Sequence, residues 1–131
     1  MIIKKTKIGF SILEIIIILA VVGIMMSGLI PLFMSVLTAN KSAAYYSEAY
    51  KVADSRIEEL RSLSFESIDA EDGAENITTL PEGEVTTDIT NEIDGAPRDN
   101  LRQVIITITW NFKSEKTYST STLIAEGGIG R

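Results

Sequence analysis

Residues 15–37 read IIIILAVVGIMMSGLIPLFMSVL, and this stretch decides the fold of the chain. No charged residue occurs between Glu14 and Lys41. The run exceeds the roughly 20 residues that a helix needs to cross a hydrocarbon core about 30 Å thick. Its apolar residues would cover every side of the helix, whereas a surface helix of a soluble domain has one apolar stripe. We therefore expect a membrane-spanning helix within residues 10–40.

The charges on the two sides of this run differ in sign. Lys4, Lys5 and Lys7 give the first nine residues a charge of +3. By the positive-inside rule, this leader places the N-terminus in the cytoplasm and the following domain outside it. A cleavable secretory signal would have a shorter apolar region and an A-x-A-like site, and neither is present. A plain signal anchor fits the hydropathy and remains an alternative.

The composition excludes several classes of function. Nine of the 12 lysines and arginines follow Gly9, against 18 acidic residues, so that part carries a charge of −9. An acidic domain lacks the clustered cations of a nucleic-acid binder. The chain has no cysteine and no histidine, which excludes disulfides, Cys-His and Ser-His-Asp catalysis and the usual zinc sites. We expect no enzymatic activity, no metal site and no cofactor.

Glu14 does not fit a plain membrane anchor, because it lies at the edge of the apolar run after Ile12 and Leu13. A carboxylate well inside a bilayer costs roughly 2.5–3.5 kcal/mol on insertion scales, and less near the headgroups. Glu14 is therefore either a boundary residue that reaches water or a charge that has a partner cation.

The string Gly9-Phe10-Ser11-Ile12-Leu13-Glu14, between a lysine-rich leader and a long apolar run, resembles the prepilin signature of the type IV pilin superfamily. This superfamily comprises major and minor pilins and the pseudopilins of type II secretion and competence systems. The resemblance implies that a prepilin peptidase removes residues 1–9 by cleaving between Gly9 and Phe10, and that the new Phe10 amine is methylated. Ser11 replaces the commoner threonine of the signature.

The resemblance also implies a partner for Glu14. The methylated Phe10 amine keeps its positive charge, and in the family this amine faces the glutamate of a neighbouring subunit during assembly. Opposite charges in an apolar filament core attract strongly and offset each other's burial. Pro31 and Gly23 weaken the same helix, because proline removes a hydrogen bond and crowds the carbonyl of Ser27. These residues predict a kink, and the resemblance adds that the segment between Gly23 and Pro31 loses helicity in an assembled filament.

The part that follows residue 40 is expected to be an extracytoplasmic domain, residues 41–131. Apolar residues recur at spacings of three and four up to Leu63, which predicts that the helix continues as an amphipathic segment over residues 41–63. An acidic loop over residues 64–81 lacks the spacing of an EF-hand calcium loop. Alternating residues predict antiparallel strands within residues 82–126, strongest over residues 104–112. Residues 127–131 are expected to form a flexible tail.

The expected fold is α+β, with a long N-terminal helix whose second half packs on a small antiparallel sheet, as in type IV pilins. The C-terminal half has a weaker similarity to minor pilins of the PilV type, in the strings SRIEELRSLSFESI and TSTLIAEGG. The expected function is that of a structural subunit, a minor one, of a type IV pilus or related filament. A pseudopilin of a type II secretion or competence DNA-uptake system is the alternative.

The resemblance implies partners and a location. The partners are other pilin or pseudopilin subunits that bind through the N-terminal helix, the prepilin peptidase and methyltransferase, and an inner-membrane assembly platform. The location is the cytoplasmic membrane, crossed once, and then a cell-surface or periplasmic filament. The sequence leaves open which filament system the chain serves, whether the subunit is major or minor, and whether its role is adhesion, motility, DNA uptake or secretion. It also leaves open which surfaces meet neighbouring subunits and whether the acidic loop binds calcium.

Overall fold

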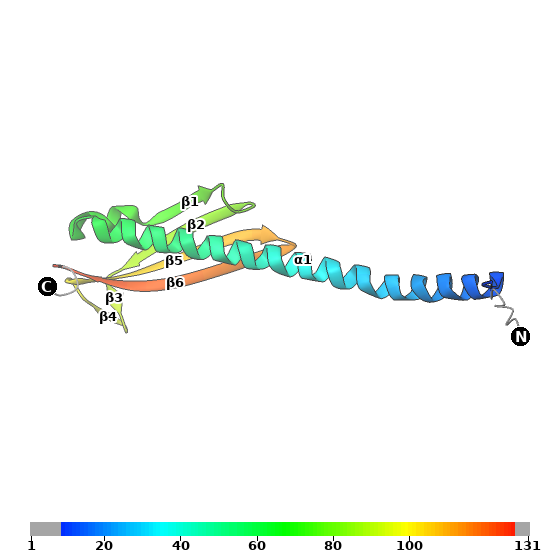
Figure 1. The fold of residues 1–131 in the computed structure, drawn as a ribbon. Coiled ribbons are helices and arrows are strands. Elements are labelled where there is room, and N and C mark those ends of the chain that lie inside the picture. Colours follow the sequence, from blue (N-terminus) through cyan, green and yellow to red (C-terminus); the bar gives the residue numbers. More distant parts are fainter. Residues whose placement is uncertain (1–8, 128–131) are drawn as a thin grey trace, which may run out of the picture. The chain divides into compact units, whose positions relative to one another are not determined.

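A computed structural model describes residues 9–127 as an α+β protein, with one long N-terminal helix followed by a small antiparallel sheet (Figure 1). Helix α1 comprises Ile12–Ser62, 51 residues, which agrees with the expected helix within one or two residues at each end. The chain divides into two compact units, one ending at Asn40 and one beginning at Lys41. We describe each unit by itself.

The strands of the second unit form two sheets. The main sheet has the order β1-β2-β5-β6, with every neighbouring pair antiparallel, and a two-stranded sheet joins β3 to β4. The strands are β1 (Gly73–Ile77), β2 (Gly83–Thr90), β3 (Glu92–Ile93), β4 (Ala96–Pro97), β5 (Leu101–Phe112) and β6 (Ser114–Ala125). A 3₁₀ helix, η1 (Phe65–Glu71), links α1 to β1.

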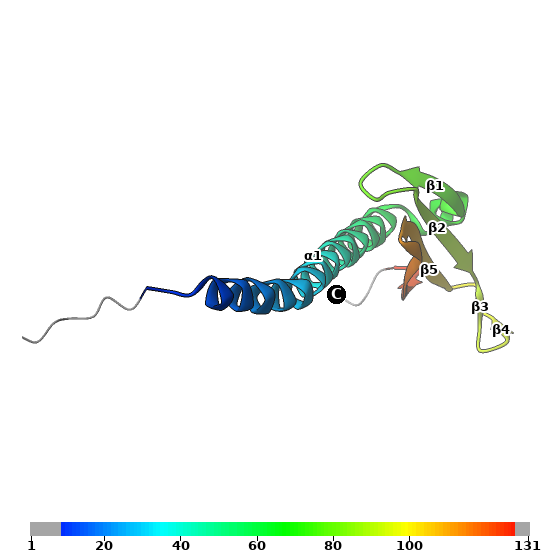
Figure 2. The same ribbon diagram turned by 90° about the vertical axis from the view of Figure 1, so that its right-hand side faces the viewer.

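The C-terminal half of α1 packs on one face of the main sheet, as the side view shows (Figure 2). Alternate residues of β5 are fully buried, as their period of two predicts. They share the hydrophobic core with two small residues of α1, Ala49 and Ala53. The core consists of Ala49, Ala53, Leu60, Ile68, Leu80, Val85, Val104, Ile106, Ile108 and Trp110. Burial of these apolar side chains between α1 and the main sheet is the main force that holds the second unit together.

Three aromatic pairs join α1 to the β5–β6 hairpin. Tyr46 meets Trp110 edge to face with ring centroids 4.9 Å apart. Tyr45 packs on Phe112 and Tyr50 on Tyr118 in the same way, at 5.1 and 6.3 Å. Such pairs contribute about 0.5–1.5 kcal/mol each beyond their buried area. They fix the position of the helix along β5.

The segment 64–81, which the sequence predicts to be a loop, contains η1 and β1. That prediction was therefore too coarse. Strand β1 has the sequence GAENI, which is poor in β-branched and aromatic residues, so its pairing with β2 decides its structure rather than its own propensity. Similarly, η1 forms where Ile68 enters the core, with an exposure of 1%.

Two tight turns connect paired strands of the second unit. Asp94 and Gly95, both with positive φ, form the turn of the β3–β4 hairpin, which extends away from the main sheet in both views. The turn between β5 and β6 is a single residue, Lys113, with φ of 61°, because Phe112 pairs with Ser114. The β5–β6 pair is antiparallel, as predicted for the strands within residues 82–126.

Candidate functional site

The start of α1 carries the residues that the sequence singles out. Gly9, Phe10 and Ser11 precede the helix, and the Ile15 amide donates a hydrogen bond to the Ser11 carbonyl at 3.2 Å. Phe10 is 71% exposed, so the Gly9–Phe10 bond lies in accessible, non-helical chain. Proteolysis requires such a segment, since a peptidase binds an extended substrate. The leader lysines Lys4, Lys5 and Lys7 lie outside the described residues.

Glu14 lies in the first turn of α1. A carboxylate is favoured there by the partial positive charge of the helix N-terminus, which contributes about 0.3–1 kcal/mol at exposed sites. Among residues 9–127, Glu14 forms no hydrogen bond or ion pair. A cation that neutralises Glu14 in an apolar setting would therefore have to come from outside this part of the chain.

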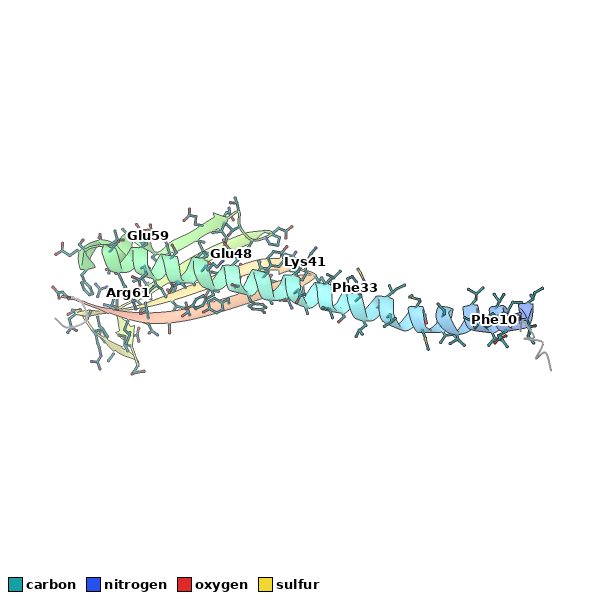
Figure 3. All side chains as sticks on the ribbon, in the orientation of Figure 1. Phe10, Phe33, Lys41, Glu48, Glu59 and Arg61 are labelled. Carbon is teal, nitrogen blue, oxygen red and sulfur yellow. The ribbon has the colours of Figure 1, made fainter. Side chains whose placement is uncertain are left out.

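In the first unit, exposed apolar side chains project from α1 as far as Leu37 (Figure 3). The helix is long and apolar enough to cross a membrane, judged by length and composition. The exposed large apolar residues before Thr38 include Ile16, Leu19, Ile24, Met25, Leu32 and Phe33, each more than half exposed. An apolar surface of this extent needs either lipid or another protein to cover it.

The helix is unbroken across both positions that were expected to weaken it. Gly23 and Pro31 lie within α1, and Gly23 has open space where a side chain would be. The Ser27 hydroxyl donates to the Ile24 carbonyl at 2.7 Å, an intrahelical bond that is common for serine in apolar helices. Local melting in an assembled filament stays a prediction, since it concerns a state with neighbours.

Arg56 links α1 to η1. Its guanidinium donates to Glu59 at 2.7 Å and to Glu71 at 3.1 Å. Burial lowers the pKa of Arg56, but the hydrogen bond to Glu59 and the nearby carboxylates, including that of Glu75, give a net rise. The Nε atom of Arg56 is buried and has no hydrogen-bond partner within residues 9–127. Arg56 therefore stays charged and ties the end of α1 to the segment before β1.

Arg56 lines two solvent-accessible clefts, which have volumes of about 360 and 310 Å³. Acidic side chains dominate the polar lining of both, among them Glu48, Glu59 and Glu75. Within residues 9–127, no cluster of three or more histidine, cysteine or acidic side chains is placed to hold a metal ion. The clefts thus offer charged surface rather than a recognisable set of ligating or reacting groups.

Arg102, at the start of β5, holds η1 from the other side. Its guanidinium donates two hydrogen bonds to the Asp69 carboxylate, at 2.8 and 3.1 Å, and a third to the Asp99 carbonyl at 3.1 Å. Its guanidinium carbon lies 4.8 Å from the centroid of the Phe65 ring. The bidentate geometry is specific to arginine. The hydrogen bond from Arg102 lowers the pKa of Asp69, while burial opposes this shift and the positive charge of Arg102 adds to it.

We expect the stability of the second unit to fall in acid partly through Asp69. The folded-state pKa of Asp69 lies below the value of 3.8 for an unpaired carboxyl, so its contribution is present above that pH. It is lost as the pH falls through the folded pKa. The Asp69→Asn variant should melt at a lower temperature than wild type at neutral pH, by a small amount because solvent screens the pair.

Melting curves of both proteins between about pH 7 and about pH 2 test this expectation. The difference in Tm should shrink as the pH falls, and added salt should reduce it at neutral pH. A difference that stays constant over this range would show that Asp69 acts through packing instead of through its charge.

Neither Arg56 nor Arg102 could be singled out from the sequence. The local signals were ambiguous, because Arg56 has Glu59 three residues away on the same helix, a common surface pair. Their long-range partners, Glu71 and Asp69, lie 15 and 33 residues away and are identified only by the fold.

Comparison with protein-family models, with curated proteins and with solved structures found no match for this chain.

Proposed function

We propose that this chain is a structural subunit, a minor one, of a type IV pilus or a related filament. It is inserted in the cytoplasmic membrane as a prepilin, cleaved after Gly9 and methylated at Phe10. It then assembles with other subunits through the N-terminal part of α1. A prepilin peptidase, a methyltransferase and an inner-membrane assembly platform are its expected partners, and its role is not enzymatic.

One observation carries the proposal: the Gly9-Phe10 bond lies in exposed, non-helical chain directly before an apolar helix whose first turn holds Glu14. A generic membrane anchor needs neither an accessible bond at that place nor a carboxylate at the start of the apolar segment. The α+β layout and the exposed apolar helix support a filament subunit, since such a helix can serve first as anchor and later as assembly surface.

A pseudopilin of a type II secretion or competence system is a second candidate, supported by the same features. These 131 residues contain no cysteine, so they cannot form the disulfide-closed C-terminal loop of many major pilins. This absence favours a minor subunit or a pseudopilin over a major pilin. Co-purification of the chain with components of one filament system would separate the two.

The first test is the intact mass and the N-terminal sequence of the chain recovered from membranes or sheared filaments. The proposal predicts a mature chain that begins at a methylated Phe10. The Gly9→Arg variant places a long charged side chain at the cleaved bond and should remain full length. A wild-type chain that still begins at Met1 in cells with an active prepilin peptidase would favour a plain membrane-anchored domain.

A matched control is Gly23→Ala, since this glycine lies within α1 and has open space around it. Its processing should equal that of wild type, because the substitution leaves residues 9–14 unchanged. Equal loss of processing in both variants would indicate that the helix as a whole, and not the Gly9–Phe10 bond, was disturbed.

A further inference from the structure

The two edges of the main sheet are complementary in direction. Strand β1 forms one edge and β6 the other, and each successive pair in the order β1-β2-β5-β6 is antiparallel. With four strands, β1 and β6 therefore run in opposite directions. If a second copy stands beside the first in the same orientation, its β1 meets the β6 of the first in an antiparallel sense.

The β6 edge is well suited to such pairing. It is 12 residues long, has no proline, and its only charged residues are Glu115 and Lys116 at its beginning. Natural proteins usually shorten, charge or cover their sheet edges to prevent pairing between molecules. Among the described residues, the backbone groups of β6 pair only with β5. Just after the strand, the Glu126 amide donates a hydrogen bond to the Asn100 carbonyl. The outward backbone groups of β6 are open to another strand.

The register across the sheet shows which residues would meet. Ala74 pairs with Thr86, Thr86 with Thr107, and Thr107 with Ser119, so these four residues share one level and one face. A second copy at the same height would place its Ala74 opposite Ser119 of the first. Both side chains are exposed on the sheet face away from α1.

The charges at these edges are also complementary. On the opposite face, Glu75 shares a level with Tyr118, and Lys116 lies two residues from Tyr118 on β6. Between two copies, Glu75 and Lys116 would be diagonal neighbours about 7–8 Å apart at the backbone, within reach of a lysine side chain. Within residues 9–127 neither of the two forms an ion pair at contact distance.

We propose that the β6 edge of one copy of this chain binds the β1 edge of a second copy, extending the sheet from molecule to molecule. The proposal rests on the proposed function, because a shared membrane or filament is what gives the copies one orientation. The interface is heterologous, with β6 on one side and β1 on the other, so each subunit can bind two neighbours. For a minor subunit that primes assembly, such pairs would form in the membrane.

Cysteine cross-linking tests the pairing, since the chain contains no cysteine of its own. In the full-length Ala74→Cys, Ser119→Cys double variant the two positions lie on opposite edges of one sheet, about 14 Å apart for strands spaced at about 4.8 Å. A disulfide needs Cα atoms closer than about 7 Å, so it can form only between molecules. In oxidised membranes of producing cells, we expect a ladder of dimers, trimers and larger species.

A small axial offset between copies would shift the register in steps of two residues. Thr117→Cys and Ser121→Cys, each combined with Ala74→Cys, cover the neighbouring registers on the same face. The matched control is Ala74→Cys with Thr109→Cys, because Thr109 faces the same way but lies on the central strand β5. The control should give no ladder.

Charge variants provide a second measurement. Lys116→Glu places two acidic groups together at the interface and should reduce the cross-linked fraction several-fold. Adding Glu75→Lys to that variant restores opposite charges and should restore cross-linking. If Lys116→Glu leaves the cross-linked fraction unchanged, the proposed register is overturned.

The N-terminal mass of the same samples separates this proposal from the proposed function. Chains processed at Phe10 that give no ladder with any of the three cysteine pairs would overturn edge pairing and leave the filament function intact. The Ser119→Cys single variant gives a further test. If it forms cross-linked dimers and nothing larger, the β6–β1 pairing is overturned in favour of a symmetric β6–β6 contact. Unprocessed chains that give no ladder would contradict both proposals.

Discussion

The Glu14→Ala variant is expected to enter the membrane and to be cleaved after Gly9, yet to be nearly absent from filaments. Insertion should proceed at least as well as in wild type, because the substitution removes a charge from the edge of the apolar run. Cleavage should persist, since Gly9 and Phe10 are unchanged and precede the helix. Assembly should fail because the methylated amine of a neighbouring subunit would be buried without its partner.

The size of this effect follows from the cost of an unpaired buried charge. Removing one member of a buried ion pair costs about 3–5 kcal/mol. A loss of about 3 kcal/mol corresponds to a roughly hundredfold drop in the ratio of assembled to membrane-bound subunit. The ratio is measured by quantifying the chain in sheared filaments and in the membrane fraction of the same cells.

Two variants act as controls for this experiment. Glu14→Gln preserves the size of the side chain without its charge and should fail to assemble, as Glu14→Ala does. Glu58→Ala removes a carboxylate from an exposed position of the same helix, where it pairs with Arg61, and should assemble normally. Normal filament levels of Glu14→Ala would mean that Glu14 is only a boundary residue.

The Trp110→Ala variant is expected to lose most of the stability of the second unit. Trp110 is 2% exposed and packs edge to face against Tyr46. Truncating a buried tryptophan costs about 3–5 kcal/mol, through lost burial and the cavity that remains. A small domain has a total stability of about 5–15 kcal/mol, so this loss is a large fraction of it.

The measurement is thermal unfolding of the full chain in detergent, followed by circular dichroism. For a domain of this size, each kcal/mol lowers Tm by roughly 4–8 °C, so we expect a fall of at least about 12 °C. Thr109→Ala is the matched control, because Thr109 is the adjacent residue of β5 and faces away from α1. It should shift Tm by only a few degrees. Equal shifts in the two variants would show that the α1–sheet contact is not the main source of stability.

The sequence predicted the long helix well because its signal is local and repeated. An uncharged apolar run of more than 20 residues predicts a membrane-spanning helix. Apolar residues that then recur every three or four positions predict that the helix continues. The strand β5 was predicted equally well, since its strict alternation places Val104, Ile106 and Ile108 on one face. Both signals lie within a few neighbouring residues, and no distant contact is needed to interpret them.

The sequence predicted β1 and η1 poorly because their signals are not local. Strand β1 exists through its pairing with β2, and η1 through the burial of Ile68 and the two arginines that hold it. The β1–β2 pairs join residues 6 to 14 positions apart, and the two arginine contacts join residues 15 and 33 positions apart. Propensity, which measures only what a segment prefers by itself, carries no information on them.

The features used in the two proposals also differ in whether the sequence or the fold reveals them. The sequence alone singled out Gly9, Phe10 and Glu14 as candidates, because the proposed cleavage junction is a short linear feature followed at once by an apolar helix. Only the tertiary structure decided the order of the strands, and with it which two strands form the edges of the sheet. Strand order depends on long-range pairing, so the complementarity of β1 and β6 could not be inferred before the fold was known.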